Sequence, residues 1–437
     1  MREIASPLSG IRSPFGGRVD PYKVAGFRPA LVLDFAGGYY RTGGALSDLG
    51  SAVTHTRASS ATMRNSAGTL VTVGSNVLRD GRHVWNGSAW VNEGVLIEGE
   101  ARTNVLTFPE DLSNAAWSKS APVTIGTPVT RKGVSLDQIV SDGTAAFSNV
   151  SQSLGSVPDG GYVTFSGHIE AGTSTQTAIR IDSGGNNCTD TLTWAGGIPT
   201  VASAARSGLT HIRTELEDLA DGLYRVLMTV QNNTGGPLTC AGDYYVQWAG
   251  PGAALDTYAG GFQGELAATA SSYNGSGVAR VADALSVGAP DLPYNAAGMS
   301  SFHKLTLNYE DTGTATEQTL FDWRADANNR ITITLDTAGA NTGKVTLAVV
   351  NGGSSVSVTS TTQVSPGGNV AARFAWRVSA SEINIALNGT AATAVSNTAG
   401  VPNLSAASAT LGGMAARALE SAWPADIGDS GITGATA

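Results

Sequence analysis

The feature that most constrains this chain is the strict alternation of apolar and polar residues in many short segments. Residues Asn329–Asp336 read NRITITLD, which would place Ile331, Ile333 and Leu335 on one face of a strand. Glycine-rich stretches such as NGGSS and SPGGN separate segments of this kind. The chain is therefore predicted to be an all-β protein with antiparallel strands. The other alternating segments are Tyr162–Ile169, Gln176–Ile181, Leu223–Val230, Asp243–Trp248, Lys304–Glu310, Lys344–Val349, Arg373–Val378 and Glu382–Leu387.

The composition fits an ordered β protein and excludes several other classes. Glycine accounts for 55 of the 437 residues without a three-residue period, which excludes a collagen-like chain. Hydrophobic residues make up 41%, enough for a core, so disorder is not expected. The net charge of −9 argues against a nucleic-acid partner. We also expect neither membrane insertion nor a standard secretion signal, because long apolar stretches are missing.

Shifts in composition divide the chain into four predicted segments. Residues 1–30 are rich in proline and glycine, so we expect an extended arm that becomes ordered against a partner. Residues 31–104 are expected to form a small β-rich adaptor. Two antiparallel β-sandwiches should follow, over residues 105–288 and 289–437, joined by a Gly/Pro linker. One helical turn is expected at Thr214–Ala220.

The search for catalytic and metal-binding patterns leads to the expectation that the chain is not an enzyme. Zinc and EF-hand motifs are missing from the sequence, and no cofactor is predicted. Calcium bound by dispersed loop carboxylates stays open, because motif spacing would not detect it. A glycosidase needs two acids that face each other across a cleft. The acids at 215–221 cluster on the expected helical turn, where charges usually face solvent.

The cysteines and His168 each allow a structural and a functional interpretation. Cys188 and Cys240 are too few for a disulfide framework, so we expect two buried free thiols, with one bridge as the alternative. Alternation places His168 on the polar face of its strand, beside Tyr162 and Ser166. We therefore expect a solvent-facing histidine, with a ligand-binding role as the alternative.

The tryptophans supply the candidate sugar-binding groups, because sugars stack on exposed aromatic faces beside polar side chains. Trp85 and Trp90 flank an Asn-Gly turn and should be neighbours across a hairpin, while Trp376 should be in the core. The first candidate group is Trp194 with Asp190 and Asn187. The second is Trp323 with Asp322 and Asp326, for which a strand end with Trp323 in the core is the alternative.

Three stretches resemble a module string found in virion proteins of tailed bacteriophages and gene transfer agents. RASSATMRNSAG at Arg57–Gly68 is similar to the family's RASSATY-x-D-x-x-G, with Asn65 where an acid is commoner. GVLIEGEARTNVL at Gly94–Leu106 is similar to GLLIE-x-ARTNLL. PEDLSNAAW at Pro109–Trp117 is similar to SEDFSNAAW.

In that family a jelly roll that looks like a carbohydrate-binding module usually follows the string. DGLYR at Asp221–Arg225 is similar to its D-G-W-Y-R strand, with Leu223 in place of tryptophan. Tyr258–Tyr273 resembles its closing motif, W-G-x-Q-L-E-x-G-x-x-A-T-S-Y. The C-terminal block resembles a concanavalin A-like or laminin-G-like sandwich. The resemblance thus implies a jelly roll over 105–288 and a lectin-like sandwich over 289–437.

The resemblance implies a virion protein, a tail or head fibre or spike, assembled in the bacterial cytoplasm and displayed on the virion surface. Its arm would bind other virion proteins, and its sandwiches would contact host cell-surface polysaccharide. A homo-oligomer is expected, with a trimer favoured. The alternatives are a decoration protein with purely structural sandwiches and a polysaccharide depolymerase. The residues expected to dock on the virion are Ile11, Arg12, Pro14 and Phe15.

Overall fold

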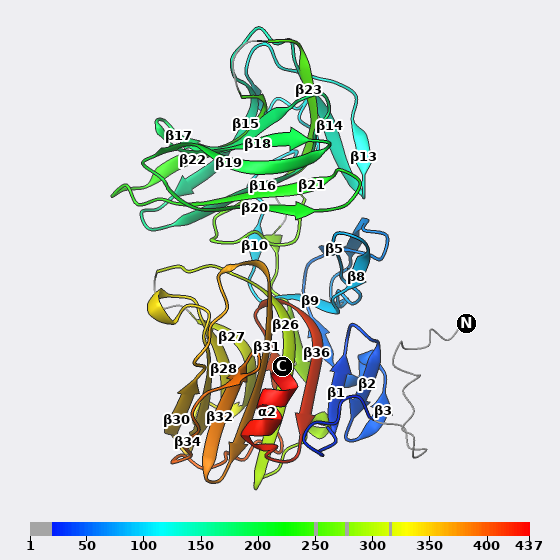
Figure 1. The fold of residues 1–437 in the computed structure, drawn as a ribbon, viewed down its shortest axis with the longest axis vertical. Coiled ribbons are helices and arrows are strands. Elements are labelled where there is room, and N and C mark those ends of the chain that lie inside the picture. The colour runs from blue at the N-terminus through cyan, green and yellow to red at the C-terminus, as the bar shows by residue number, and fades with distance from the viewer. Residues whose placement is uncertain (1–19, 249–251, 276–278, 314–316) are drawn as a thin grey trace, which may run out of the picture.

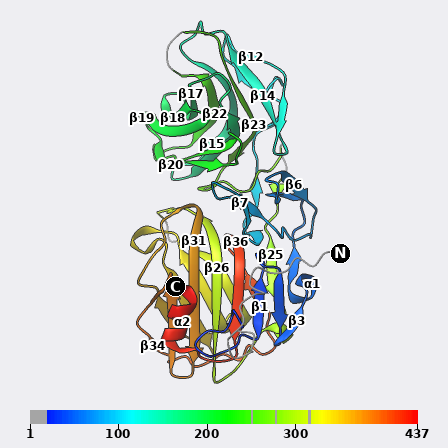
Figure 2. The same ribbon diagram turned by 45° about the vertical axis from the view of Figure 1, so that its right-hand side comes forward.

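The computed structural model describes residues 20–248, 252–275, 279–313 and 317–437. These residues form almost entirely β structure, which confirms the predicted fold class. Two β-sandwiches lie end to end, one above the other in Figures 1 and 2. The predicted virion-docking residues, Ile11, Arg12, Pro14 and Phe15, lie outside the described residues.

The upper sandwich consists of two antiparallel sheets that we name after a central strand of each. The order of strands in the β22 sheet is β11 (Ser118–Lys119), β15 (Ser148–Val157), β22 (Leu238–Gln247), β17 (Gln176–Ser183), β18 (Asn186–Ala195) and β19 (Ile198–Ser207). The order in the β16 sheet is β12 (Thr124–Ile125), β14 (Val134–Ser141), β23 (Leu255–Glu265), β16 (Tyr162–Glu170), β21 (Tyr224–Gln231) and β20 (Thr210–Asp218), with β13 (Val129–Arg131) also on β14.

The core of the upper sandwich comes from the alternate residues that each strand turns inward. Phe165 and Phe262 stack with ring centroids 5.4 Å apart, and Trp117 packs against Phe262. Cys188 and Cys240 lie in this core as free thiols, which confirms the expectation of unpaired cysteines. The sandwich therefore has a hydrophobic core of its own.

The lower sandwich also consists of two sheets, and they face each other across a second core. The order in the β26 sheet is β3 (Ala45–Ser47), β2 (Tyr39–Thr42), β1 (Leu31–Asp34), β36 (Met414–Trp423), β26 (Gly298–Tyr309), β31 (Gly367–Ser379), β32 (Glu382–Leu387) and β33 (Thr390–Ala391), with β34 (Val395–Ser396) on β32 and β9 (Val95–Glu98) on β36. The order in the β28 sheet is β30 (Ser354–Thr359), β29 (Val345–Asn351), β28 (Asn329–Asp336), β27 (Glu317–Asp326), β35 (Ala409–Leu411), β25 (Ala284–Val287) and β4 (Thr54–Thr56).

The segment expected to be a separate adaptor contributes strands to both sheets of the lower sandwich. Strand β1 pairs with the second half of β36, and β9 pairs with the first half. On the other sheet, β4 pairs with β25. The sheets therefore run across the boundary predicted at residue 104. The reason is that the apolar faces of β1 and β9 cover the same core as the C-terminal strands.

The upper sandwich is inserted into the lower one. The chain leaves the lower sandwich through β10 (Arg102–Thr103) and returns through β24 (Ala279–Arg280), and these two strands pair with each other. Two hairpins lie beside this junction, as the blue strands at the centre of Figure 1 show. They are β5 (Ala61–Arg64) with β6 (Leu70–Val73), and β7 (His83–Trp85) with β8 (Trp90–Asn92).

Helical structure is sparse among the described residues, and one of the expectations about it was wrong. Thr214–Ala220 was expected to be helical, but most of it belongs to strand β20, where Leu216 packs against the core and Glu215 and Glu217 point to the opposite face. No helix in the described part of the chain is long and apolar enough to cross a membrane. The helices are α1 (Leu49–Ala52), η1 (Ala289–Asp291), η2 (Gly339–Asn341) and α2 (Gly428–Thr436).

Candidate functional site

The first predicted sugar-binding group is divided between the two faces of its sheet. Trp194 is 8% exposed, lies in the core and donates from Nε1 to Thr177 Oγ1 at 3.0 Å. Asp190 is buried on the same inward side, where it pairs with Arg206 and His211. Asn187 pairs across the sheet with Asp182 and is half-buried on the outer face. Because side chains alternate along β18, Trp194 and Asn187 do not form one platform.

The second predicted group is divided in the same way. Trp323 is buried in the lower core and donates to the carbonyl of Ala407 at 2.9 Å, which confirms the alternative that this residue is in the core. Asp322 points away and pairs with Arg324 at 2.5 Å. Asp326 is exposed and accepts from the backbone N–H of Asn328 in a turn. A sugar therefore has no access to the ring face of Trp323.

A cluster of three aromatic rings lies near the surface of the upper sandwich, where Phe147 and Trp248 are accessible and Tyr245 is buried. Phe147 is 52% exposed and lies before β15, while Tyr245 and Trp248 lie at the end of β22. The Trp248 ring is 4.9 Å from both Phe147 and Tyr245, with edge-to-face geometry. We call Phe147, Tyr245 and Trp248 the aromatic patch. Edge-to-face packing of this kind holds the rings in place and leaves ring surface available to a ligand.

Polar side chains border the aromatic patch on the outer face of the β22 sheet. Arg180 donates to Tyr245 Oη at 3.0 Å and also contacts Asp182. Asp243 lies across from Arg180 in the strand register, and burial raises the pKa of its carboxyl group. Asn149 pairs with Tyr245 in the neighbouring strand. The patch thus combines apolar ring faces with hydrogen-bonding groups, which is the chemistry that sugar recognition needs.

Sequence reasoning missed the aromatic patch because its parts are far apart in the chain. Tyr245 and Trp248 lie in the segment DYYVQW, which was recognised as a strand. Phe147 comes from a turn about 100 residues earlier, and only strand pairing between β15 and β22 brings it close. The signal in the sequence that could have indicated the patch is Trp248, at the very end of its predicted strand. At such a position alternation no longer fixes the direction of the side chain.

A cleft of about 460 Å³ lies between the two sandwiches. The β16 sheet forms one wall, the ends of β26, β31 and β36 form the other, and the two hairpins close one side. Its lining is half polar and strongly charged. The charged and imidazole side chains that line it are Arg64, Arg82, His83, Glu98, His168, Arg213, Glu215, Glu217 and Arg225.

His168 lies at the cleft and is not the solvent-facing residue that was expected. It is 1% exposed, because the hairpin of β5 and β6 covers this face of the β16 sheet. Arg64 contacts its Nε2 at 3.0 Å, and its Nδ1 faces the Gly261 carbonyl at 3.3 Å. Burial, together with the charges of Arg64 and Arg225, holds the pKa of His168 well below 6.5. The imidazole is therefore neutral at pH 7, with Nε2 as an acceptor.

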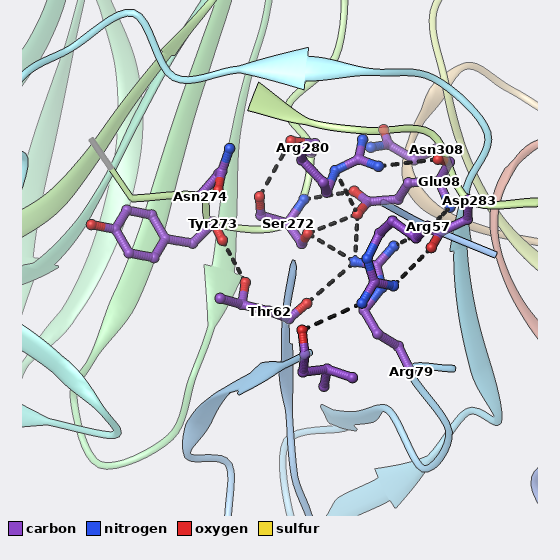
Figure 3. A network of polar contacts seen from close by, with 12 residues as sticks. Arg57, Thr62, Arg79, Glu98, Ser272, Tyr273, Asn274, Arg280, Asp283 and Asn308 are labelled. Carbon is purple, nitrogen blue, oxygen red and sulfur yellow. Dashed lines mark hydrogen bonds and ion pairs between the residues drawn. The ribbon is translucent and has the colours of Figure 1, made fainter. Parts of the chain in front are cut away.

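Arg57 and Glu98, from two of the family-like motifs, take part in a buried ionic network beside the cleft (Figure 3). Asp283 accepts from Arg57 at 2.8 Å and from Arg79. Glu98 pairs with Arg79 at 2.5 Å and with Arg280 at 3.3 Å. We call Arg57, Arg79, Glu98, Arg280 and Asp283 the junction network. Its members are almost completely buried and come from both sides of the inserted sandwich.

The junction network explains why these motifs use charged residues. Burial would raise the pKa of Glu98, but the charges of Arg79 and Arg280 and the hydrogen bonds from Ser272 outweigh it and lower the pKa below 4.5. Ser272 follows the last long strand of the upper sandwich, so Glu98 ties that sandwich to the lower one. The motif residues Arg57 and Glu98 therefore help to hold the junction together.

The comparisons with known proteins give distant matches in structure alone. No family model matches the chain, and no curated protein does. The receptor-binding domain of botulinum neurotoxin mosaic serotype C/D matches with a TM-score of 0.27 and 11% identity, over 35% of this chain and 38% of that one. At this level of similarity, functions do not transfer to this chain.

Two further matches are with a domain of a sialidase and with a trans-sialidase. The CBM40 domain of a Ruminococcus gnavus sialidase, solved with sialyllactose, has a TM-score of 0.26 and 11% identity, over 32% of this chain and 83% of that one. The leech intramolecular trans-sialidase has a TM-score of 0.26 and 13% identity, over 32% of this chain and 23% of that one.

Within the described residues, no group of three or more His, Cys, Asp or Glu side chains is placed to hold a metal ion.

Proposed function

We propose that this chain is a virion surface protein that binds host cell-surface polysaccharide through its inserted jelly roll. The observation that carries the proposal is the aromatic patch, with an exposed Phe147 and a partly exposed Trp248 beside Arg180 and Asp182. Rigid aromatic faces bind the C–H faces of sugars, and neighbouring charged groups orient the hydroxyls. The virion assignment rests on the motif string at 57–117, which resembles that of phage virion proteins.

The architecture fits a display role. The upper sandwich is held at two chain crossings, β10 and β24, and projects away from the lower one (Figure 2). The first strand of the described chain, β1, belongs to the lower sandwich, whereas the aromatic patch belongs to the upper one. Attachment through the N-terminal segment would therefore leave the patch free to contact a cell. The homo-oligomer and the docking partners remain part of this proposal.

The proposal is tested by incubating the purified full chain with bacterial host cells and with the same cells stripped of surface polysaccharide. We expect the chain to sediment with the intact cells and to stay in the supernatant with the stripped cells. Equal retention by both would contradict glycan binding. No retention by either, from a chain that circular dichroism shows to be folded, would favour the purely structural role instead.

A further inference from the structure

The cleft between the sandwiches contains two buried arginines that form no ion pair with a carboxylate among the described residues. Arg64 and Arg225 are 8% and 7% exposed, and both line the cleft. Arg64 contacts the Gly68 carbonyl and His168, and Arg225 donates to Ser166 Oγ and the Ser271 carbonyl. All four partners are neutral. Buried guanidinium groups are normally paired with carboxylates, so two unpaired ones beside one cavity need an explanation.

The neighbouring arginines show what a paired guanidinium looks like in this molecule. In the junction network, Arg57, Arg79 and Arg280 are equally buried, yet each contacts Glu98 or Asp283. The Nε atom of Arg225 is buried and has no hydrogen-bond partner among the described residues, and the same is true of Arg79 and Arg280. Arg64 and Arg225 differ from these three arginines in that no ion pair joins either of them to a carboxylate among the described residues.

The remaining charged groups of the cleft are already engaged, with one exception. Glu98 belongs to the junction network, Glu215 binds Arg213 at 3.4 Å and the Gly368 N–H at 3.0 Å, and Arg82 pairs with Glu93. Arg213 also pairs with Glu310. His83 Nδ1 contacts the Gly81 carbonyl.

The exception is Glu217, which lies opposite Arg225 in the strand register and acts electrostatically on Arg64. Arg64 and Arg225 carry two positive charges and Glu217 carries one negative charge, so one further negative charge would make this group neutral. Burial and the charges of Arg225 and Arg82 lower the pKa of Arg64 to about 10, although the charge of Glu217 acts in the opposite direction. A carboxylate carries the one negative charge that is missing, whereas a phosphate dianion carries two.

We propose that the cleft binds one carboxylated sugar residue, with its carboxylate held between Arg64 and Arg225. The inference rests on the proposed glycan-binding function and specifies its ligand as an acidic polysaccharide. The volume of about 460 Å³ lies within the range of roughly 300–1,000 Å³ for small-ligand sites. Leu227 and Met414 supply apolar wall beside the charged end, which suits the ring of a sugar.

The test measures binding of the full chain to millimolar glucuronate, galacturonate and mannuronate, and to their methyl esters, by titration calorimetry. The esters keep the ring and remove the charge, so the comparison needs no variant. We expect at least one uronate to bind, and its ester to bind about tenfold more weakly or worse. Inorganic sulfate and phosphate are further arms, and tighter binding of either would show an ion site rather than a sugar site.

Variants then test whether the carboxylate of the uronate binds to the arginines of the cleft. Arg225→Gln should weaken uronate binding at least about tenfold, and Arg225→Lys should restore part of it. Arg324→Gln is the matched control, because Arg324 is half-exposed and pairs with Asp322 far from the cleft. Equal binding of acid and ester, or binding unchanged in Arg225→Gln, would overturn the inference.

The outcomes for the two proposals are distinguishable. If no uronate binds but intact cells still retain the chain, the inference about the cleft fails and the proposed function stands. If a uronate binds in the cleft but cells do not retain the chain, the proposed function fails and the cleft remains a site for a carboxylate. A chain that binds neither contradicts both.

Discussion

Replacing Asp283 by asparagine is expected to lower the free energy of unfolding by about 3–5 kcal/mol, because it leaves buried cations without a counter-charge. Both oxygens of Asp283 accept hydrogen bonds, from Arg57 at one side and from Arg79 and the Glu98 N–H at the other. The amide NH2 of asparagine would face one of these donors in either orientation. The loss is a large part of the 5–15 kcal/mol that typically stabilises a domain.

The measurement is urea unfolding followed by circular dichroism and tryptophan fluorescence. Asp326→Asn is the matched control, since Asp326 is an exposed turn residue for which we expect a change within about 0.5 kcal/mol. A midpoint for Asp283→Asn that equals that of the control would contradict the structural role of the junction network.

Low pH should also lower the free energy of unfolding through the junction network. The pKa of Asp283 is lowered, since hydrogen bonds from His55 and Arg57 and the charge of Arg79 outweigh the effect of burial. A carboxylate with a lowered pKa stabilises the fold above its unfolded pKa, near 3.8 for Asp283 and 4.5 for Glu98, and this contribution is lost as the pH falls further. The wild type should therefore lose stability below about pH 4.5 more steeply than Asp283→Asn.

Removing residues 1–104 is expected to unfold the lower sandwich, because that segment supplies strands to both of its sheets. Leu31, Leu33, Phe35, Val95 and Ile97 are buried in the lower core. Burial of these five side chains contributes roughly 10 kcal/mol, which is comparable with the whole stability of a domain. Without β1 and β9, one edge of β36 would also be exposed for aggregation.

The fragment 289–437 should therefore be insoluble or unfolded, while the chain from residue 20 onward folds. The inserted upper sandwich is the internal comparison: fragment 104–275 keeps a complete core and should fold by itself. Circular dichroism and size-exclusion chromatography of the three chains distinguish these cases. A folded, monomeric 289–437 would show that the shared strands are dispensable.

Alternation in the sequence was enough to predict the strands but not which strands share a sheet. The segments at 162–169 and 329–336 are strands as predicted, and Trp85 and Trp90 are neighbours across their hairpin. The pairing of β1 and β9 with β36 joins residues more than 300 positions apart, and local patterns carry no information about it. For this reason the adaptor looked separate in the sequence.

The candidate site was harder to predict, for two physical reasons. The choice of Trp194 with Asn187 overlooked strand parity, since an odd separation along β18 places side chains on opposite faces. His168 was assigned to a polar sheet face correctly, but the face is covered by the hairpin of β5 and β6. Solvent exposure of a sheet face depends on what packs over it, and here that segment is about 100 residues away in the chain.

The central claim is that the aromatic patch binds surface polysaccharide. The most direct test immobilises purified bacterial surface polysaccharides and measures binding of the full chain and of the double variant Phe147→Ala, Trp248→Ala. Phe27→Ala is the control, because Phe27 is an exposed aromatic residue of the lower sandwich. We predict that the double variant binds at least about tenfold more weakly, while the control matches the wild type. Unchanged binding by a folded double variant would contradict the claim.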